Sequence, residues 1–132
     1  MERDESISLI EAAKKAYNNA LATYSNYRVG AALLAESGKI YIGCNLESSS
    51  YGLSICAERN AIANAVVNGE RNFKAIAIYS DNGATPCGAC RQVIWDICGN
   101  IEIYIIDKKR LVKTFLLKEL FPKPFDKVKL NR

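Results

Sequence analysis

Five cysteines and a complete lack of histidine define the chemistry available to this chain of 132 residues. Without imidazole, Ser-His-Asp and Cys-His nucleophilic catalysis are excluded, together with every metal site that uses histidine. An odd number of cysteines argues against a framework of disulfides and favours metal ligands, a reactive thiol or thiols buried in the core. The spacing of the cysteines separates these possibilities.

Three of the cysteines are spaced as ligands of one metal ion. Cys87 and Cys90 are three positions apart, and on a helix such residues face the same side. Cys56 adds a third sulfur from the start of another predicted helix, with the carboxylate of Glu58 two residues later. A Cys-x-x-Cys pair alone is equally typical of a redox centre, but the additional Cys-Ala-Glu segment favours zinc.

The number of protein ligands distinguishes a catalytic zinc site from a structural one. A structural site has four protein ligands, whereas a catalytic site has three and keeps a position for water. The remaining cysteines are Cys44, at the end of a predicted strand, and Cys98, more than two helical turns beyond Cys90. We predict that both are buried thiols of the core. The alternative, a non-catalytic zinc module closed by a fourth cysteine, stays open.

Charged residues beside the cysteines complete a possible catalytic group. Glu58 is close enough to a ligand to act as a general acid and base, although a solvated glutamate favoured by the helix dipole would occupy the same position. Three thiolates leave zinc with a net charge of −1, which a hydrogen bond from arginine to sulfur would offset. We rank Arg59 above Arg91 for this role, and either arginine is alternatively a surface residue.

The apolar pattern predicts alternating helices and strands that position these residues. The first helix has a possible capping box formed by Ser8 and Glu11, and residues 46–55 are predicted to form a loop. The expected elements, in order, are a helix over 6–21, strands over 28–34 and 40–45, a helix over 56–68, a strand over 73–79, a helix from 87 to just before 99, strands over 101–106 and 111–115, and a short helix over 116–121. Such an order implies one sheet with helices on its faces and parallel pairing of the later strands.

The composition is that of a folded globular chain, with 49% hydrophobic and 24% charged residues. We expect one domain over residues 1–132. Apolar runs are far shorter than the roughly 18 residues of a membrane span. The N-terminal residues also lack the apolar segment of a secretory signal. We therefore expect a cytoplasmic protein with no membrane partner.

The net charge of +4 is concentrated in the C-terminal part of the chain. Residues 1–106 contain 9 Lys and Arg against 11 Asp and Glu, a balance of −2, whereas residues 107–132 contain 9 against 3, a balance of +6. Scattered lysines in a terminal segment are typical of a solvated face, although a basic end is also able to contact phosphate. We therefore expect no nucleic-acid partner.

At the cysteine segments the sequence resembles the cytidine deaminases, specifically the small homotetrameric type that binds zinc through cysteines alone. The resemblance extends over nearly the whole chain. It includes the segments 24–33, 43–47 and 119–122, and Tyr51. Together with the order of elements, it implies an α/β fold of three α-β-α layers with a mixed five-stranded sheet.

The resemblance also implies a role for individual residues. Cys56, Cys87 and Cys90 would bind one zinc ion per subunit, Glu58 would move protons, and Arg59 would support the ligands. The nucleoside-binding residues would be Asn45 and Glu47, at the ribose hydroxyls, and Tyr27, against the pyrimidine in a place where the family usually has phenylalanine. Tyr51 and Phe125 would complete a neighbouring subunit's pocket, so the resemblance implies a homotetramer with shared pockets.

The implied reaction is the zinc-dependent hydrolytic deamination of cytidine and 2′-deoxycytidine to uridine and 2′-deoxyuridine, with release of ammonia, in pyrimidine salvage. The chain departs from the family at Ser48-Ser49 and in a loop before Pro86 that is shorter than usual, which affects substrate breadth. One alternative is the deamination of a cytosine nucleoside antibiotic such as blasticidin S. Bases within a polynucleotide are another, but the first 106 residues offer no positively charged track for phosphates.

Overall fold

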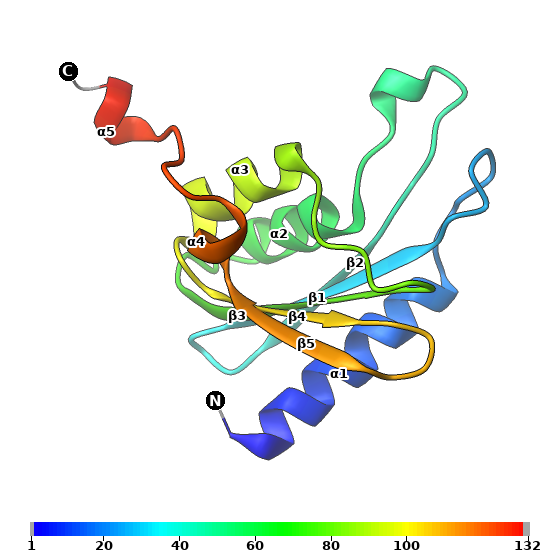
Figure 1. The fold of residues 1–132 in the computed structure, drawn as a ribbon, viewed down its shortest axis with the longest axis horizontal. Coiled ribbons are helices and arrows are strands. Elements are labelled where there is room, and N and C mark those ends of the chain that lie inside the picture. Colours follow the sequence, from blue (N-terminus) through cyan, green and yellow to red (C-terminus); the bar gives the residue numbers. More distant parts are fainter. Residues whose placement is uncertain (1, 131–132) are drawn as a thin grey trace.

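A five-stranded sheet forms the middle layer of the structure, a computed structural model that describes residues 2–130. The strand order is β2-β1-β3-β4-β5. The observed bounds lie within one or two residues of the predicted ones: β1 (Val29–Ala35), β2 (Ile40–Cys44), β3 (Phe73–Ser80), β4 (Glu102–Ile106) and β5 (Val112–Leu116). The predicted fold of three α-β-α layers with a mixed sheet is confirmed (Figure 1).

The pairing of the strands is mixed because their connections differ in length. β1 pairs antiparallel with both β2 and β3, and β3 pairs parallel with β4 across helix α3 (Gly88–Cys98). β5 pairs antiparallel with β4, so the prediction of parallel later strands is wrong for this pair. Only residues 107–111 connect the two strands, and parallel pairing needs a much longer crossover.

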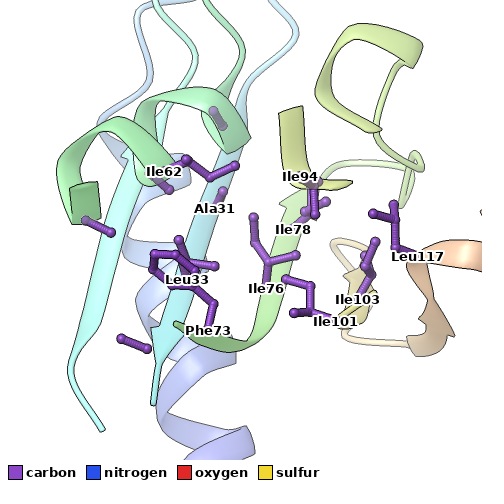
Figure 2. Packing of buried hydrophobic residues seen from close by; sticks show 14 of the residues in the cluster. Ala31, Leu33, Ile62, Phe73, Ile76, Ile78, Ile94, Ile101, Ile103 and Leu117 are labelled. Atoms are coloured by element: carbon purple, nitrogen blue, oxygen red, sulfur yellow. The ribbon is translucent and has the colours of Figure 1, made fainter. Parts of the chain in front are cut away.

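The sheet is covered by helices on both faces because β1 and β3 bury residues on both sides. Side chains of β1 alternate: Ala31 and Leu33 join the core below α2 (Ala57–Val67) and α3, whereas Ala32 and Leu34 join the core against α1 (Arg3–Asn18). Figure 2 shows the first of these cores, in which Ile62 of α2 and Ile94 of α3 face the sheet. The two helices that carry the cysteines therefore rest on the same side of the sheet.

Two glycines allow helices to approach the sheet closely. A Cβ atom at Gly43 of β2 would lie 2.3 Å from the backbone nitrogen of Ala61 in α2. A Cβ atom at Gly30 of β1 would lie 2.1 Å from the carbonyl oxygen of Ala13 in α1. Both distances are far below a van der Waals contact, so only glycine permits this packing.

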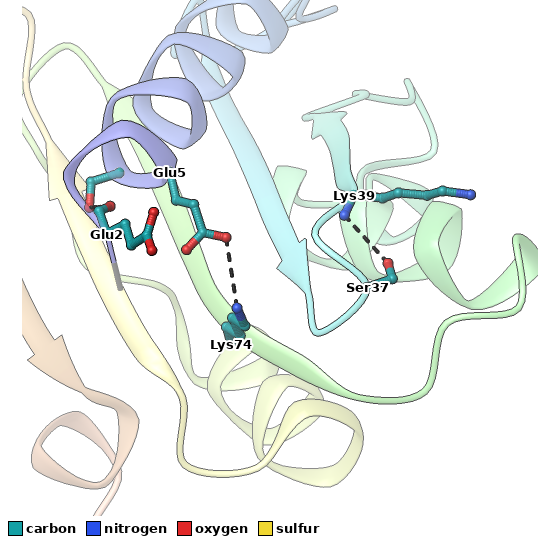
Figure 3. A network of polar contacts seen from close by, with 6 residues as sticks. Glu2, Glu5, Ser37, Lys39 and Lys74 are labelled. Atoms are coloured by element: carbon teal, nitrogen blue, oxygen red, sulfur yellow. Dashed lines mark hydrogen bonds and ion pairs between the residues drawn. The ribbon is translucent and has the colours of Figure 1, made fainter.

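Helix α1 begins and ends about three residues earlier than predicted. Ser8 and Glu11 lie inside the helix, so the capping box is wrong, and Asp4 and Glu5 occupy the first turn instead. Acidic residues are favourable there because the helix dipole is positive at its N-terminus. Glu5 also forms an ion pair with Lys74 of β3 at 3.7 Å (Figure 3). In the turn after β1, the Lys39 amide donates to the Ser37 hydroxyl at 3.4 Å (Figure 3).

The segments that surround the cysteines are less regular. Residues 45–56 extend away from the sheet and contain a short 3-10 helix, η1 (Tyr51–Leu53), which was not predicted (Figure 1). Leu21, expected at the end of the first helix, instead forms an isolated bridge with Leu46 of this segment. At the C-terminal end, the predicted short helix is observed as α4 (Leu117–Leu120), and α5 (Lys127–Leu130) was not predicted. Over residues 2–130, the helices are too short or too polar to cross a bilayer.

Candidate active site

The start of α2 and the start of α3 bring three cysteines together. Cys56 and Cys87 are the residues that immediately precede the two helices, and Cys90 lies in the first turn of α3. The three sulfur atoms lie within 4.8 Å of one another, with 3.9 Å between Cys56 and Cys87. This donor set fits a zinc ion, which prefers thiolate ligands in a tetrahedral arrangement.

The surroundings of the cysteines favour negatively charged sulfur. The N-terminal end of each helix directs its positive dipole toward the cluster. The Arg59 Nη2 atom donates to Cys56 Sγ at 3.6 Å. Hydrogen bonds from the Cys90 thiol and from Arg59 lower the pKa of Cys56 to about 5, whereas the bond to Cys56 and burial raise the pKa of Cys90. The cluster therefore offers at least one thiolate at neutral pH, with a guanidinium group beside it.

Glu58 lies in the first turn of α2, where only 5% of it is exposed. Burial raises the pKa of Glu58 to about 7, against an ordinary value of 4.5. A carboxyl group with a pKa near the working pH both accepts and donates protons efficiently. The arrangement is therefore suited to general acid and base catalysis beside the sulfur atoms.

A cavity of about 270 Å³ opens next to the cysteines and Glu58. Its lining residues come from several elements far apart in the sequence and include Tyr27, Asn45, Glu47, Ala84 and Thr85. Among the described residues that line it, none is lysine or arginine. The cavity thus presents amide, carboxylate and aromatic groups to a ligand and offers no positive charge to a phosphate.

Asn45 and Glu47 reach this cavity while holding the backbone around it. The Asn45 side chain accepts a hydrogen bond from the Val29 amide at 2.9 Å and donates one to the Tyr27 carbonyl at 2.8 Å. Glu47 accepts bonds from the Ser25 hydroxyl and from the amides of residues 24 and 25, and the Ser25 hydroxyl contributes most to a lowered pKa for Glu47. Both side chains are therefore fixed in position before any ligand binds.

Tyr27 lines the same cavity, and its hydroxyl reaches the loop before Pro86. The hydroxyl donates to Asn82 Oδ1 at 2.5 Å, which links the start of β1 to residues 81–85. Sequence reasoning missed Asn82. The available signal was the tyrosine itself, because a phenol in a place usually taken by phenylalanine needs a hydrogen-bond partner.

Two predicted binding residues lie outside the cavity of their own chain. Tyr51 is 74% exposed and packs edge-to-face against Tyr24, with ring centroids 5.7 Å apart. Phe125 is 55% exposed and borders a different cavity, beside Trp95. The structure thus brings Tyr27, Asn45 and Glu47 to the cavity beside the cysteines and leaves Phe125 apart from it. Tyr51 lines an adjoining hollow that shares Glu47 with that cavity.

The alternative ligands and the second arginine lie elsewhere. The Cys44 thiol is 3.6 Å from the Asn19 carbonyl, and burial raises the pKa of Cys98 to about 12. Neither residue belongs to the sulfur cluster, although both are only half-buried. Arg91 donates to the carbonyls of residues 86 and 120 and to the Thr85 hydroxyl, so it supports the chain around the site without contacting sulfur.

Comparison with known sequences identifies relatives that share this arrangement. Residues 2–105 match the family described as the cytidine and deoxycytidylate deaminase zinc-binding region. The cytidine deaminase of Sporosarcina psychrophila is 45% identical over 126 residues, which cover 93% of each chain. The cytidine deaminase of Halalkalibacterium halodurans is 38% identical over 126 residues, which cover 93% of this chain and 96% of the relative.

Solved structures have the same fold. The cytidine deaminase from Burkholderia pseudomallei superposes with a TM-score of 0.88 at 41% identity, covering 95% of this chain and 100% of that one. The enzyme from Mycobacterium tuberculosis gives a TM-score of 0.79 at 34% identity, covering 91% of this chain and 96% of that one. The matched region is described as zinc-binding, and the three clustered cysteines within it supply the donors for that ion.

Proposed function

The chain belongs to the cytidine and deoxycytidylate deaminase family, and from this premise we propose that it hydrolyses cytidine and 2′-deoxycytidine to the uridines, with release of ammonia. One observation carries the proposal: three sulfur donors and a buried carboxyl group meet at a cavity that also contains an amide and a second carboxylate. We assign this reaction to pyrimidine salvage, in which free pyrimidine nucleosides are reused.

Cys56, Cys87 and Cys90 would hold one zinc ion per subunit, because their three sulfur atoms lie within 4.8 Å of one another. When bound, zinc acts as a Lewis acid that makes water nucleophilic near neutral pH. The positive ends of α2 and α3 and the guanidinium of Arg59 offset the charge of three thiolates.

Glu58 performs the proton transfers of the reaction. Its carboxylate accepts a proton from the attacking water and delivers it to N3 of the pyrimidine. It then accepts the remaining proton of the new hydroxyl group on C4 and passes it to the amino group, which leaves as ammonia while the C4 carbonyl forms. The raised pKa of Glu58 supports this cycle, because the group must be deprotonated at the first step and protonated at the next. Its burial also keeps bulk water from competing for the proton.

Asn45, Glu47 and Tyr27 orient the nucleoside. An amide and a carboxylate offer both a donor and acceptors to ribose hydroxyls, and the Tyr27 ring offers a flat surface to the base. A free nucleoside fits this lining better than a polynucleotide, because the lining described above lacks the cations that phosphates require. Turnover measured on cytidine, blasticidin S and single-stranded oligonucleotides distinguishes these substrates.

The proposed assembly is a homotetramer in which Tyr51 and Phe125 complete the cavity of a neighbouring copy. Both residues are exposed and absent from the lining of the cavity beside the cysteines, and Tyr51 lines an adjoining hollow that shares Ser25 and Glu47 with that cavity, which supports this assignment. The five free cysteines suit a reducing compartment and support a cytoplasmic location.

The decisive experiment follows cytidine turnover by ultraviolet absorbance in the zinc-loaded protein. We expect turnover that disappears on treatment with a zinc chelator and returns when zinc is added back. A zinc-loaded protein that leaves cytidine unchanged, or one that works equally well after the metal has been removed, would overturn the proposed function.

A further inference from the structure

The loop between β3 and α3, residues 81–85, forms one wall of the cavity. Ala84 and Thr85 line the cavity, and the chain then continues through Pro86 to Cys87. Four of the five loop residues are exposed, so hydrophobic packing does little to hold the loop in place. Its position must therefore depend on hydrogen bonds.

Four side chains anchor this loop: Arg91 donates to the Thr85 hydroxyl at 3.0 Å, and one of the other three anchors, Tyr27, also lines the cavity. The Tyr17 hydroxyl donates to Asp81, and the Ala84 amide donates to the Ser80 hydroxyl at 3.1 Å. The fourth anchor is the bond from the Tyr27 hydroxyl to Asn82 Oδ1 at 2.5 Å. Because Tyr27 and Ala84 line the same cavity, this bond connects two segments that both contribute to its lining.

Tyr27 is a firm anchor because its backbone is fixed on both sides. Its amide donates to the Ser25 hydroxyl at 3.0 Å, and its carbonyl accepts from the Asn45 side chain at 2.8 Å. Ser25 is held in turn by Glu47. The exposed loop is therefore the more compliant of the two segments that the Asn82 bond connects.

We propose that Asn82 is a positioning residue that sets the width of the substrate cavity. Because Asn82 accepts a hydrogen bond from the Tyr27 hydroxyl, it keeps residues 81–85 at a fixed distance from the Tyr27 ring. The pyrimidine would bind in the space between this ring and the loop. The inference rests on the proposed function for the identity of that ring. Glu58 lies on α2, outside this link, so Asn82 acts on the binding and selection of the base more than on the chemical step.

The test compares Asn82→Ala and Tyr27→Phe in the zinc-loaded full chain. We expect each substitution to raise KM for cytidine about three- to tenfold, the range that one lost hydrogen bond produces. We expect kcat to stay within about twofold of the unmodified value. We expect the double variant to have the same KM as each single variant, because all three remove the same hydrogen bond. We also expect the more mobile loop to raise the turnover of 5-methylcytidine, which carries a bulkier base, relative to the turnover of cytidine.

Two further variants separate positioning from general destabilisation. Asn82→Asp keeps an acceptor oxygen for the Tyr27 hydroxyl and restores the KM of the unmodified protein. Tyr41→Phe removes a comparable hydroxyl bond, to Glu70 at 2.8 Å, which lies away from the cavity, so it leaves KM unchanged. Amide hydrogen exchange in residues 81–85 becomes faster in Asn82→Ala and stays unchanged in Tyr41→Phe.

Each other outcome decides against the inference or against its premise. An unchanged KM, loss of zinc in Asn82→Ala, or unchanged exchange in residues 81–85 overturns the role of Asn82. Failure of the unmodified chain to deaminate cytidine overturns the proposed function instead. In that case the exchange measurement still decides whether Asn82 holds the loop.

Discussion

Glu58 and the cysteines owe their properties to where they lie at the helix starts. Glu58 stands two residues after Cys56 in a buried first turn, so its carboxyl group is close to the sulfur cluster and shielded from solvent. An exposed glutamate at the start of a helix would keep an ordinary pKa, whereas burial raises the pKa of Glu58 to about 7.

Replacement of Glu58 by glutamine tests its role in proton transfer. Glutamine has nearly the same shape but no titratable proton, so we expect the Glu58→Gln protein to keep its zinc and lose at least about 10² to 10⁴ in kcat. Zinc content by atomic absorption and cytidine turnover measure the two effects. A variant that retains the unmodified rate would remove Glu58 from the mechanism.

Serine substitutions separate the zinc ligands from the other cysteines. Cys87 is an exposed member of the cluster, so Cys87→Ser should weaken zinc binding by more than the roughly 10- to 100-fold typical of a residue that only orients a ligand. Cys44→Ser and Cys98→Ser are the matched controls and should keep both zinc and activity. Release of zinc by either control would revive the structural-zinc alternative.

At the scale of elements, the close packing of α2 on β2 positions Cys56 and Glu58. Gly43 makes this packing possible, because any side chain at that position would meet the backbone of α2. Asn60 and Asn64 of the same helix strengthen the contact by donating to carbonyl oxygens of β2 at 2.7 and 3.2 Å. The sheet edge and the helix thus behave as one unit.

Substitution of Gly43 by alanine tests whether the close packing of α2 on β2 stabilises the fold and positions the start of α2. We expect Gly43→Ala to lower the free energy of unfolding by about 1–3 kcal/mol, the usual cost of overpacking, and to reduce turnover because the start of α2 shifts. Urea denaturation measures the stability. Gly88→Ala is the matched control, since a Cβ atom there meets nothing within 4 Å, and its unfolding midpoint should not fall.

At the scale of the whole molecule, the proposed homotetramer would use surfaces that the isolated chain leaves exposed. Tyr51 and Leu53 of η1 are 74% and 68% exposed, and Phe125 is 55% exposed. Exposed aromatic and aliphatic residues around a binding cavity are typical of an interface. Sedimentation of a fully active monomer would contradict the proposed assembly.

Mixing two impaired variants tests whether cavities are shared. Alone, Glu58→Gln lacks the proton-transfer group, and Phe125→Ala lacks the residue proposed to complete a neighbour's cavity. In a mixed assembly, Phe125 of the first chain would complete cavities that contain Glu58 of the second. We expect unfolding and refolding of the mixture to give more cytidine turnover than the sum of the separately refolded variants. Simple additivity would place Phe125 outside the cavity of any copy.

Much of the fold followed from local pattern. Strand and helix bounds in residues 28–121 were predicted closely, because alternating apolar residues in strands and amphipathic spacing in helices are local signals. The predicted range of α1 was about three residues too late, because Ser8 and Glu11 resemble a capping box. The observed helix begins at Arg3 and includes the acidic residues Asp4 and Glu5 in its first turn. The antiparallel direction of β5 depends on the short connection after β4.

The sequence alone determined which atoms were available for chemistry: three cysteine sulfurs in two segments, a glutamate beside one of them, and no imidazole. Residue type and local spacing set these properties, and both are visible in a linear chain. Only the tertiary structure decided that Cys44 and Cys98 lie apart from the cluster, that Glu58 is buried, and that Tyr27 bonds to Asn82. Those facts depend on contacts between residues far apart in sequence, which form only when the helices pack on the sheet.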